Sequence, residues 1–327
     1  MERRIAIGLV TLGLCFLAWP IGSAWALDYP TRPIRFVVGY PAGGATDILA
    51  RLIGQRLSER LGQQFVIENV NGAGGTLGAI RAARASPDGY TLVMGHMGTH
   101  AASVALYPNL AYDPATDFAP IGLVDETPEV LVTRKDLPPN TLQEFVAYAK
   151  ANEQKLNMAH SGVGSISYVG CVLLSSAIGI KPTMVPFTGS APATNALLAG
   201  QVDCFCDPIV AQMAHIRAGT LKGLAIAAAT RHPLLPDVPT AAEQGLPQFS
   251  ASPFFALFAP KGTPAPIVAT LAAALDQSLD DAAARTRLTE LGAAIAEKSR
   301  RGPAPLAALV QSEIARLTPI LQAAAKN

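Results

Sequence analysis

The chain has 327 residues, of which 50% are hydrophobic and 15% are charged, and its formal net charge is +1. This composition is typical of a globular protein with one large or two ordinary domains. A net charge so close to zero gives no attraction for nucleic acid or for an anionic membrane, so we expect neither as a partner.

Residues 1–26 match the pattern of a secretory signal peptide. A short basic start precedes a mostly apolar stretch over residues 5–22, and residues 24–26 (Ala-Trp-Ala) form a small-x-small cleavage site. An uncleaved anchor helix is the alternative, but Pro20 and Gly22 interrupt the apolar run. We therefore expect cleavage after Ala26 and a periplasmic mature protein.

The mature chain begins with alternating strands and helices. Short apolar runs that end in turn residues predict strands at 33–40, 65–70 and 90–96. Apolar residues at helical spacing predict helices at 47–61 and 76–85. A strand-helix-strand-helix-strand order favours a parallel sheet.

A second series of strands and helices follows. Strands at 121–125 and 129–134 lead into it, and Thr141 with Glu144 forms a capping box that opens a helix over 141–152. Further strands and helices are then predicted in alternation at 156–160, 165–178, 184–187, 191–199, 202–206, 208–217 and 221–228.

The pattern after the proline-rich stretch 231–245 predicts a return to the first series. The expected elements are a strand and three helices, at 254–260, 264–279, 281–291 and 304–324. Two crossings of the chain predict a hinge between two α/β lobes with a cleft between them. Lobe 1 then comprises residues 27–125 and 229–327, and lobe 2 comprises residues 126–228.

Five predicted strands end in a glycine-rich loop that opens a helix, within residues 34–47, 65–78, 91–101, 156–167 and 184–193. Glycine lets a ligand approach the backbone closely, and a helix N-terminus offers free N–H groups with a partial positive charge. None of the five loops carries Lys or Arg. The loops therefore predict a cleft that grips a small mono- or dicarboxylate through backbone groups, rather than a phosphate.

Residues on these loops are the candidate ligand contacts. We expect lobe 1 to hold one carboxylate, and lobe 2 to contact the distal group of the ligand. The predicted residues of lobe 1 are Tyr40, Ala42, Gly43, Gly44, Asp47, Gly74, Thr76, Thr99 and His100. Those of lobe 2 are Ser161, Ser165, Thr188, Ser190 and Asp207. Turn and cap chemistry is the alternative role of the hydroxyl side chains.

Two of these residues, both carboxylates, have structural alternatives. Asp47 lies at the start of a helix, so N-capping competes with a role in ordering loop 41–44 around the ligand. Asp207 ends a predicted strand just before Pro208 and the next helix. Asp207 is therefore also in an N-cap position. If Asp207 faces the cleft instead, it would pair with an ammonium group of the ligand, and an amino acid is therefore an alternative to a simple carboxylate.

The sequence lacks motifs for catalysis or for a cofactor. GAGGTLG at 72–78 resembles a dinucleotide fingerprint, but its spacing is G-x-G-x-x-x-G and no acidic residue follows at the required distance. The Cys204-Phe205-Cys206 stretch has no clustered His, so no metal is expected. An exported hydrolase with Ser161 or Ser165 as nucleophile stays an alternative, although no spacing supports it.

The cysteines of the mature chain leave two outcomes open. Cys204 and Cys206 lie on the same side of one predicted strand, and Cys171 lies in a helix. In an oxidising compartment Cys171 could form a disulfide with either. Buried free thiols are the other outcome and are slightly favoured.

Six stretches carry a family resemblance when they occur together in this order: YPTRPIRFVVGYPAGGATDILAR, ENVNGAGGTLGA, SPDGYTLVMG, GTHAASVALYPNLAYDPATDFAPIGLV, VPFTGSAPATNALLAGQVD and LAIAAATRHPLLPDVPTAAEQG. Over essentially the whole mature chain, the sequence resembles the Bug-type extracytoplasmic solute receptors of tripartite tricarboxylate transporters. The resemblance implies a type II-like, two-lobed periplasmic binding protein that closes on a carboxylate without transforming it.

The resemblance also implies that membrane transporter subunits receive the solute. We expect a monomer, and a solute sensor for a membrane histidine kinase is a further alternative. The family commonly has other residues at four places near the cleft: Asn for Ser103, Pro for Val104, His for Tyr168 and Tyr-Lys for Phe187-Thr188. The backbone grip should survive these departures, whereas the contacts that select the rest of the solute are expected to differ.

Overall fold

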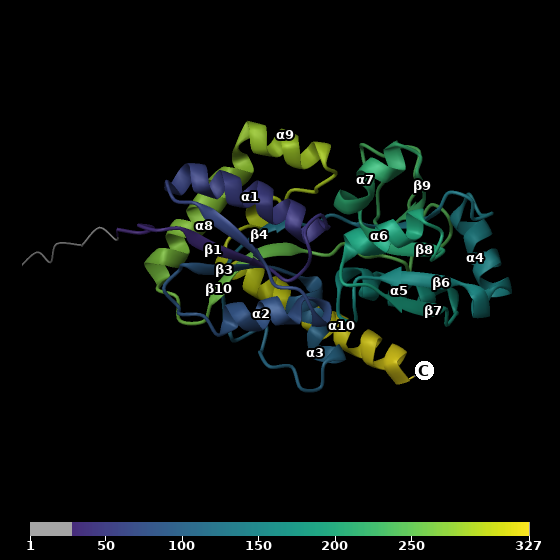
Figure 1. The fold of residues 1–327 in the computed structure, drawn as a ribbon, viewed down its shortest axis with the longest axis horizontal. Helices are drawn as coiled ribbons and strands as arrows, with labels where there is room; N and C mark the ends of the chain where they lie inside the picture. The colour runs from purple at the N-terminus through teal and green to yellow at the C-terminus, as the bar shows by residue number, and fades with distance from the viewer. Residues whose placement is uncertain (1–27, 327) are drawn as a thin grey trace, which may run out of the picture.

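The computed structural model describes residues 28–326, so the predicted signal peptide lies outside the described residues. Two five-stranded sheets form the frames of two lobes (Figure 1). The sheet of lobe 1 has the order β2-β1-β3-β10-β4, with β1 Ile34–Val38, β2 Phe65–Asn69, β3 Thr91–His96, β4 Phe118–Asp125 and β10 Phe255–Pro260. The sheet of lobe 2 has the order β7-β6-β8-β5-β9, with β5 Glu129–Arg134, β6 Asn157–His160, β7 Thr183–Pro186, β8 Cys204–Pro208 and β9 Leu221–Ile226.

Both sheets are mixed, because each takes in one strand that arrives from the other lobe. Strand β1 pairs in parallel with β2 and β3, whereas β10, which follows the return from lobe 2, is antiparallel to β3 and β4. Likewise β6 is parallel to β7 and β8, whereas β5, which enters from lobe 1, is antiparallel to β8 and β9. The predicted order of strands along the chain is confirmed.

Helices cover both faces of each sheet (Figure 1). In lobe 1 they are α1 Ala45–Leu61, α2 Thr76–Ala83, α3 Ser103–Leu106, α8 Ala265–Asp280, α9 Ala282–Glu290 and α10 Pro303–Lys326. In lobe 2 they are α4 Leu142–Ala151, α5 Ile166–Ile178, α6 Ser190–Leu198 and α7 Ile209–Arg217. Helix α10 packs on β4 and also contacts α5 across the lobes. No helix within residues 28–326 is both long and apolar enough to cross a bilayer.

Burial of apolar side chains explains why α1 forms against the first sheet. Leu49, Ile53 and Leu57 repeat at helical spacing and are fully buried, as is Phe36 of β1. Burial of each such side chain contributes about 1.5–3 kcal/mol relative to exposure. The helix ends at Gly62, whose φ of 68° places it in the left-handed region that favours glycine.

Local capping signals are only partly realised. Thr141 caps α4 by accepting the N–H of Glu144 at 3.1 Å, as predicted. Thr240 and Glu243 exchange the two bonds of a capping box, but residues 241–245 form turns and not a helix. A capping box thus fixes a turn here without starting a helix.

The first crossing between the lobes is held by the segment that precedes α10. The Thr127 hydroxyl donates to the Asp125 carboxylate at 2.7 Å and accepts the N–H of Ala294 at 2.9 Å. The N–H of Glu126 donates to the Ala294 carbonyl at 3.0 Å. The segment before α10 therefore anchors the first crossing to lobe 1.

The three cysteines Cys171, Cys204 and Cys206 are fully buried free thiols. The thiol of Cys171 donates to the Ala159 carbonyl at 3.3 Å. Buried free thiols, the slightly favoured outcome, are therefore observed. The three cysteine side chains pack in the core of lobe 2.

Candidate functional site

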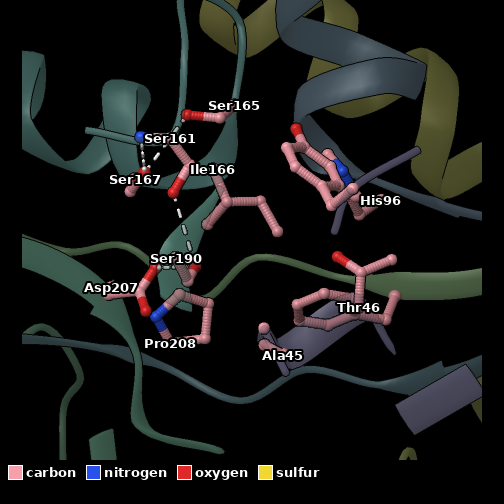
Figure 2. Close-up of a pocket in the computed structure, with 13 residues that line it drawn as sticks. Ala45, Thr46, His96, Ser161, Ser165, Ile166, Ser167, Ser190, Asp207 and Pro208 are labelled. Atoms are coloured by element: carbon pink, nitrogen blue, oxygen red, sulfur yellow. Dashed lines mark hydrogen bonds between the residues drawn. The ribbon is translucent and has the colours of Figure 1, made fainter. Parts of the chain in front are cut away.

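A cavity with about 310 Å³ of empty volume lies between the lobes. Figure 2 shows the loops of both lobes converging on it. Lobe 1 lines it with Tyr40, Gly44, Ala45, Thr46, His96 and Phe255. Lobe 2 lines it with Ser161, Ser165, Ile166, Ser167, Ser190, Asp207 and Pro208.

Three helix N-termini line the cavity. The first turn of α1 contributes residues 44–46, the first turn of α5 contributes residues 165–167, and α6 contributes Ser190. The N–H groups of a first helical turn have no intrahelical acceptor and carry a partial positive charge. The described lining includes no Lys or Arg. The positive field of the cavity therefore comes from backbone groups, which arrive from both lobes.

His96 gives lobe 1 a neutral donor. Its Nδ1 accepts the N–H of Gly98 at 3.0 Å, so the ring proton belongs on Nε2. Burial lowers the pKa of His96 to about 3, so the ring is uncharged at neutral pH. In Figure 2 the ring lies across the cavity from Ile166.

Asp207 is an acidic group in the cavity wall and is 1% exposed. Its Oδ1 accepts the hydroxyl of Ser190 at 2.9 Å, and its Oδ2 accepts Nε2 of Gln212 at 2.8 Å. The N-cap of α7 is Pro208, without a side-chain cap, so the capping interpretation of Asp207 is wrong. Burial raises the pKa of Asp207 to about 7, against the opposing effect of the bonds from Gln212 and Ser190.

Asp47 orders the loop before α1 and does not cap the helix. The N-cap is Gly44, because α1 begins at Ala45, so the N-cap interpretation of Asp47 is wrong. Its carboxylate accepts the N–H of Gly43 at 3.0 Å, a bidentate pair from Arg51, and Nδ2 of Asn69 at 2.9 Å. Burial opposes ionisation, but these hydrogen bonds hold the pKa of Asp47 below its ordinary value.

We expect Asp47→Asn to lower the free energy of unfolding at neutral pH by about 1–3 kcal/mol, the cost of breaking buried hydrogen bonds to a charge. Because the folded state depresses this pKa, the stabilisation is present above the unfolded pKa of about 4 and is lost as pH falls through the folded pKa. Thermal unfolding should therefore show that wild type and variant converge in acid. The exposed Asp237→Asn is the control, and equal stabilities at neutral pH would contradict the anchoring role.

Six of the fourteen predicted site residues line the cavity: Tyr40, Gly44, Ser161, Ser165, Ser190 and Asp207. Ala42, Gly43 and Thr188 are exposed and do not line it. Asp47 lies behind the loop, and the Thr76 hydroxyl donates to the Ala73 carbonyl at 2.8 Å. Ligand contact by all fourteen residues stays a prediction.

Gly74, Thr99 and His100 lie beside the cavity and not in its lining. Residues 98–102 form a π-helical turn, which places His100 flat against Phe258 with ring centroids 4.0 Å apart. The Thr99 hydroxyl is 2.9 Å from Nδ1 of His100. The side chains of Thr99 and His100 therefore pack behind the residues that line the cavity.

Several residues that line the cavity were not predicted from the sequence. Thr46 and Ser167 lie in first turns of helices, a position that predicted helix starts could have indicated. The Ser167 hydroxyl accepts the N–H of Ser161 at 2.9 Å and so orders the loop before α5. Phe255 comes from β10, far along the chain, and no local pattern points to it.

The lobes contact each other around the cavity. The Tyr107 hydroxyl of lobe 1 donates to the Val163 carbonyl of lobe 2 at 2.6 Å. A Cβ placed on Gly74 would lie 1.9 Å from that same carbonyl oxygen, and one placed on Gly44 would lie 3.4 Å from Cβ of Ser190. The glycines therefore let the two lobes meet in a closed arrangement.

Several solved structures resemble this chain over most of its length. MatC from Rhodopseudomonas palustris, solved with bound malate, is 49% identical with a TM-score of 0.87, over 90% of this chain and 100% of that one. The periplasmic binding protein BugD is 37% identical with a TM-score of 0.87, over 91% and 99%. An R. palustris protein solved with adipate is 36% identical with a TM-score of 0.87, over 91% and 99%.

The family comparison agrees with these structures. Residues 49–325 match the model described as the tripartite tricarboxylate transporter family receptor. This chain belongs to the tripartite tricarboxylate transporter receptor family.

Proposed function

We propose that the protein is a monomeric periplasmic receptor that captures a small organic carboxylate, in the first place a dicarboxylate, and hands it unchanged to the membrane subunits of a tripartite transporter. The observation that carries the proposal is the set of helix N-termini that reach the cavity from both lobes. Because one lies in lobe 1 and two in lobe 2, a ligand with an anionic group at each end fits best. Malate and adipate in the related structures are ligands of this kind.

We also propose that lobe 1 comprises residues 27–125 and 229–327, that lobe 2 comprises residues 126–228, and that they open about the two crossings. The distribution of strands supports this division, since β1 to β4 and β10 share one sheet and β5 to β9 share the other. A ligand that touches both lobes binds the closed form better and shifts the population toward it.

The geometry gives little support to a hydrolase. Within residues 28–326, no hydrogen bond joins Ser161 or Ser165 to a His: Ser161 lies 3.4 Å from the hydroxyl of Ser190, and Ser165 accepts the N–H of Tyr168. A serine nucleophile needs a base within hydrogen-bond reach. Membership of a receptor family likewise favours the transport role over catalysis or kinase signalling.

A thermal-shift screen of purified protein against a panel of carboxylates tests the proposal. A ligand at a hundred times its dissociation constant stabilises the folded state by about 2.7 kcal/mol, which is readily detected. We expect stabilisation by dicarboxylates such as malate or adipate, with the ligand recovered unchanged. If no carboxylate stabilises the protein, or if the ligand is consumed, the receptor function is overturned.

Export is tested by the N-terminus of the cellular protein. The apolar stretch and the small-x-small site at 24–26 lead us to expect a periplasmic chain that begins at Leu27. Mass spectrometry of a periplasmic extract checks this. A full-length product confined to the cytoplasm would contradict the location and with it the receptor function.

A further inference from the structure

A chain of hydrogen-bonding groups runs from the cavity into the core of lobe 2. Ser161 and Ser190 both line the cavity, and their hydroxyl oxygens are 3.4 Å apart. The Ser190 hydroxyl is 2.9 Å from Oδ1 of Asp207, and Oδ2 of Asp207 is 2.8 Å from Nε2 of Gln212. Figure 2 shows the Ser161, Ser190 and Asp207 part of this chain.

Gln212 fixes which oxygen of Asp207 can carry a proton. Its Nε2 donates to Asp207 and also to the Thr194 hydroxyl at 2.9 Å, so both amide hydrogens are used. Oδ2 of Asp207 is therefore held as an acceptor. A proton on Asp207 belongs on Oδ1, the oxygen that faces Ser190.

The charge of Asp207 then decides which way the hydroxyl groups point. An ionised Asp207 can only accept, so the Ser190 hydrogen points at it and the Ser161 hydrogen can follow toward Ser190. The two oxygens then present lone pairs to the cavity, which disfavour a carboxylate. A protonated Asp207 donates to Ser190, and the hydroxyl hydrogens of Ser190 and Ser161 become free to donate to the ligand.

We propose that Asp207 determines ligand specificity through this hydroxyl chain, so that the receptor takes up one proton on Asp207 when it binds a fully ionised dicarboxylate. The inference rests on the proposed receptor function and adds to it the chemical state of the site. The proton comes from solvent, is held on Oδ1 of Asp207 while the ligand is bound, and returns to solvent on release.

The other titratable groups near Asp207 do not supply this proton. Glu129 lies on the neighbouring strand β5, and burial raises its pKa well above the ordinary value, which favours its neutral form. Burial also raises the pKa of Tyr40 and lowers that of His96 to about 3, which leaves both uncharged. Cys171 is buried beside Glu129. His215 on α7 lies in an adjoining hollow with Ser190 and is therefore tested directly.

Calorimetry of L-malate binding between about pH 6 and pH 9 tests the inference, because an ordinary carboxyl with a pKa near 4 stays ionised throughout this range. With a pKa of about 7 for Asp207, we expect the dissociation constant to rise about tenfold per pH unit above neutrality. Titrations in two buffers of different ionisation enthalpy should report uptake of about one proton at alkaline pH. Binding without proton uptake would overturn the inference and leave the receptor function standing; no binding of any panel carboxylate would overturn both.

Three variants distinguish the action of the hydroxyl chain from simpler explanations of a pH dependence. Asp207→Asn should bind malate with a dissociation constant that no longer depends on pH, since its amide can donate to Ser190 permanently. Ser190→Ala should lose the gain in affinity at low pH; a full pH slope in this variant would mean that Asp207 acts by charge alone. His215→Gln should keep the slope, and its loss there would assign the proton to His215. Thermal unfolding without ligand confirms that each variant is folded.

Discussion

Gly74→Ala is expected to weaken ligand binding by at least about a hundredfold while the protein remains folded. The added Cβ would lie 1.9 Å from the Val163 carbonyl oxygen of the opposite lobe, far inside van der Waals contact. Because the clash is relieved when the lobes separate, it penalises the closed form and not folding. A hundredfold loss corresponds to about 2.7 kcal/mol of closure energy, which a contact of this kind readily costs.

The matched control is Gly62→Ala. Gly62 has a φ of 68° and Gly74 a φ of 60°, so both substitutions force a side chain into the left-handed region, at about 1–2 kcal/mol. A Cβ on Gly62 meets nothing within 4 Å, so this variant carries the backbone strain alone. Calorimetry should show near-normal affinity for Gly62→Ala and a large loss for Gly74→Ala. Similar affinities in both would mean that the lobes do not close through this contact.

The sequence predicted the order of strands and helices because each element carries its own local pattern. The apolar run of β1 and the helical spacing of Leu49, Ile53 and Leu57 need no knowledge of the rest of the chain. The glycine-rich loops also follow from local pattern, and Gly44 from one of them lines the cavity. Patterns of this kind report which face of an element is buried and where it ends.

Features that were not predicted from the sequence depend on side-chain geometry, on distant contacts or on exact helix boundaries. Gln212 lies only five residues after Asp207, in the first turn of α7, but no sequence pattern shows that its amide reaches that carboxylate. His100 was predicted in the cleft because its loop is rich in glycine, but the π-helical turn directs it at Phe258 of β10 instead. For Asp47 the error is one of boundary: the N-cap lies three residues earlier, at Gly44, and Asp47 anchors the preceding loop instead.

Gly44→Val is expected to weaken ligand binding by at least about tenfold without unfolding the protein, for a reason that differs from strain. The φ of Gly44 is −87°, so any residue can adopt this backbone conformation. Its Cβ position lies 3.4 Å from Cβ of Ser190 across the cavity, and two further methyl groups would occupy the space between α1 and α6. The valine thus fills the place where a ligand would reach the first-turn amides of α1.

A graded pair isolates this effect. Gly44→Ala places only the Cβ, at an ordinary contact distance, and it shares with valine the loss of a favourable N-cap residue, worth up to about 1 kcal/mol. We therefore expect alanine to reduce affinity less than about threefold and valine to reduce it much more, with similar unfolding temperatures for the two variants. Calorimetry with malate, and circular dichroism for folding, measures both. If the valine variant is folded and binds normally, the carboxylate does not sit at the N-terminus of α1, and the cavity must hold its ligand through lobe 2 alone.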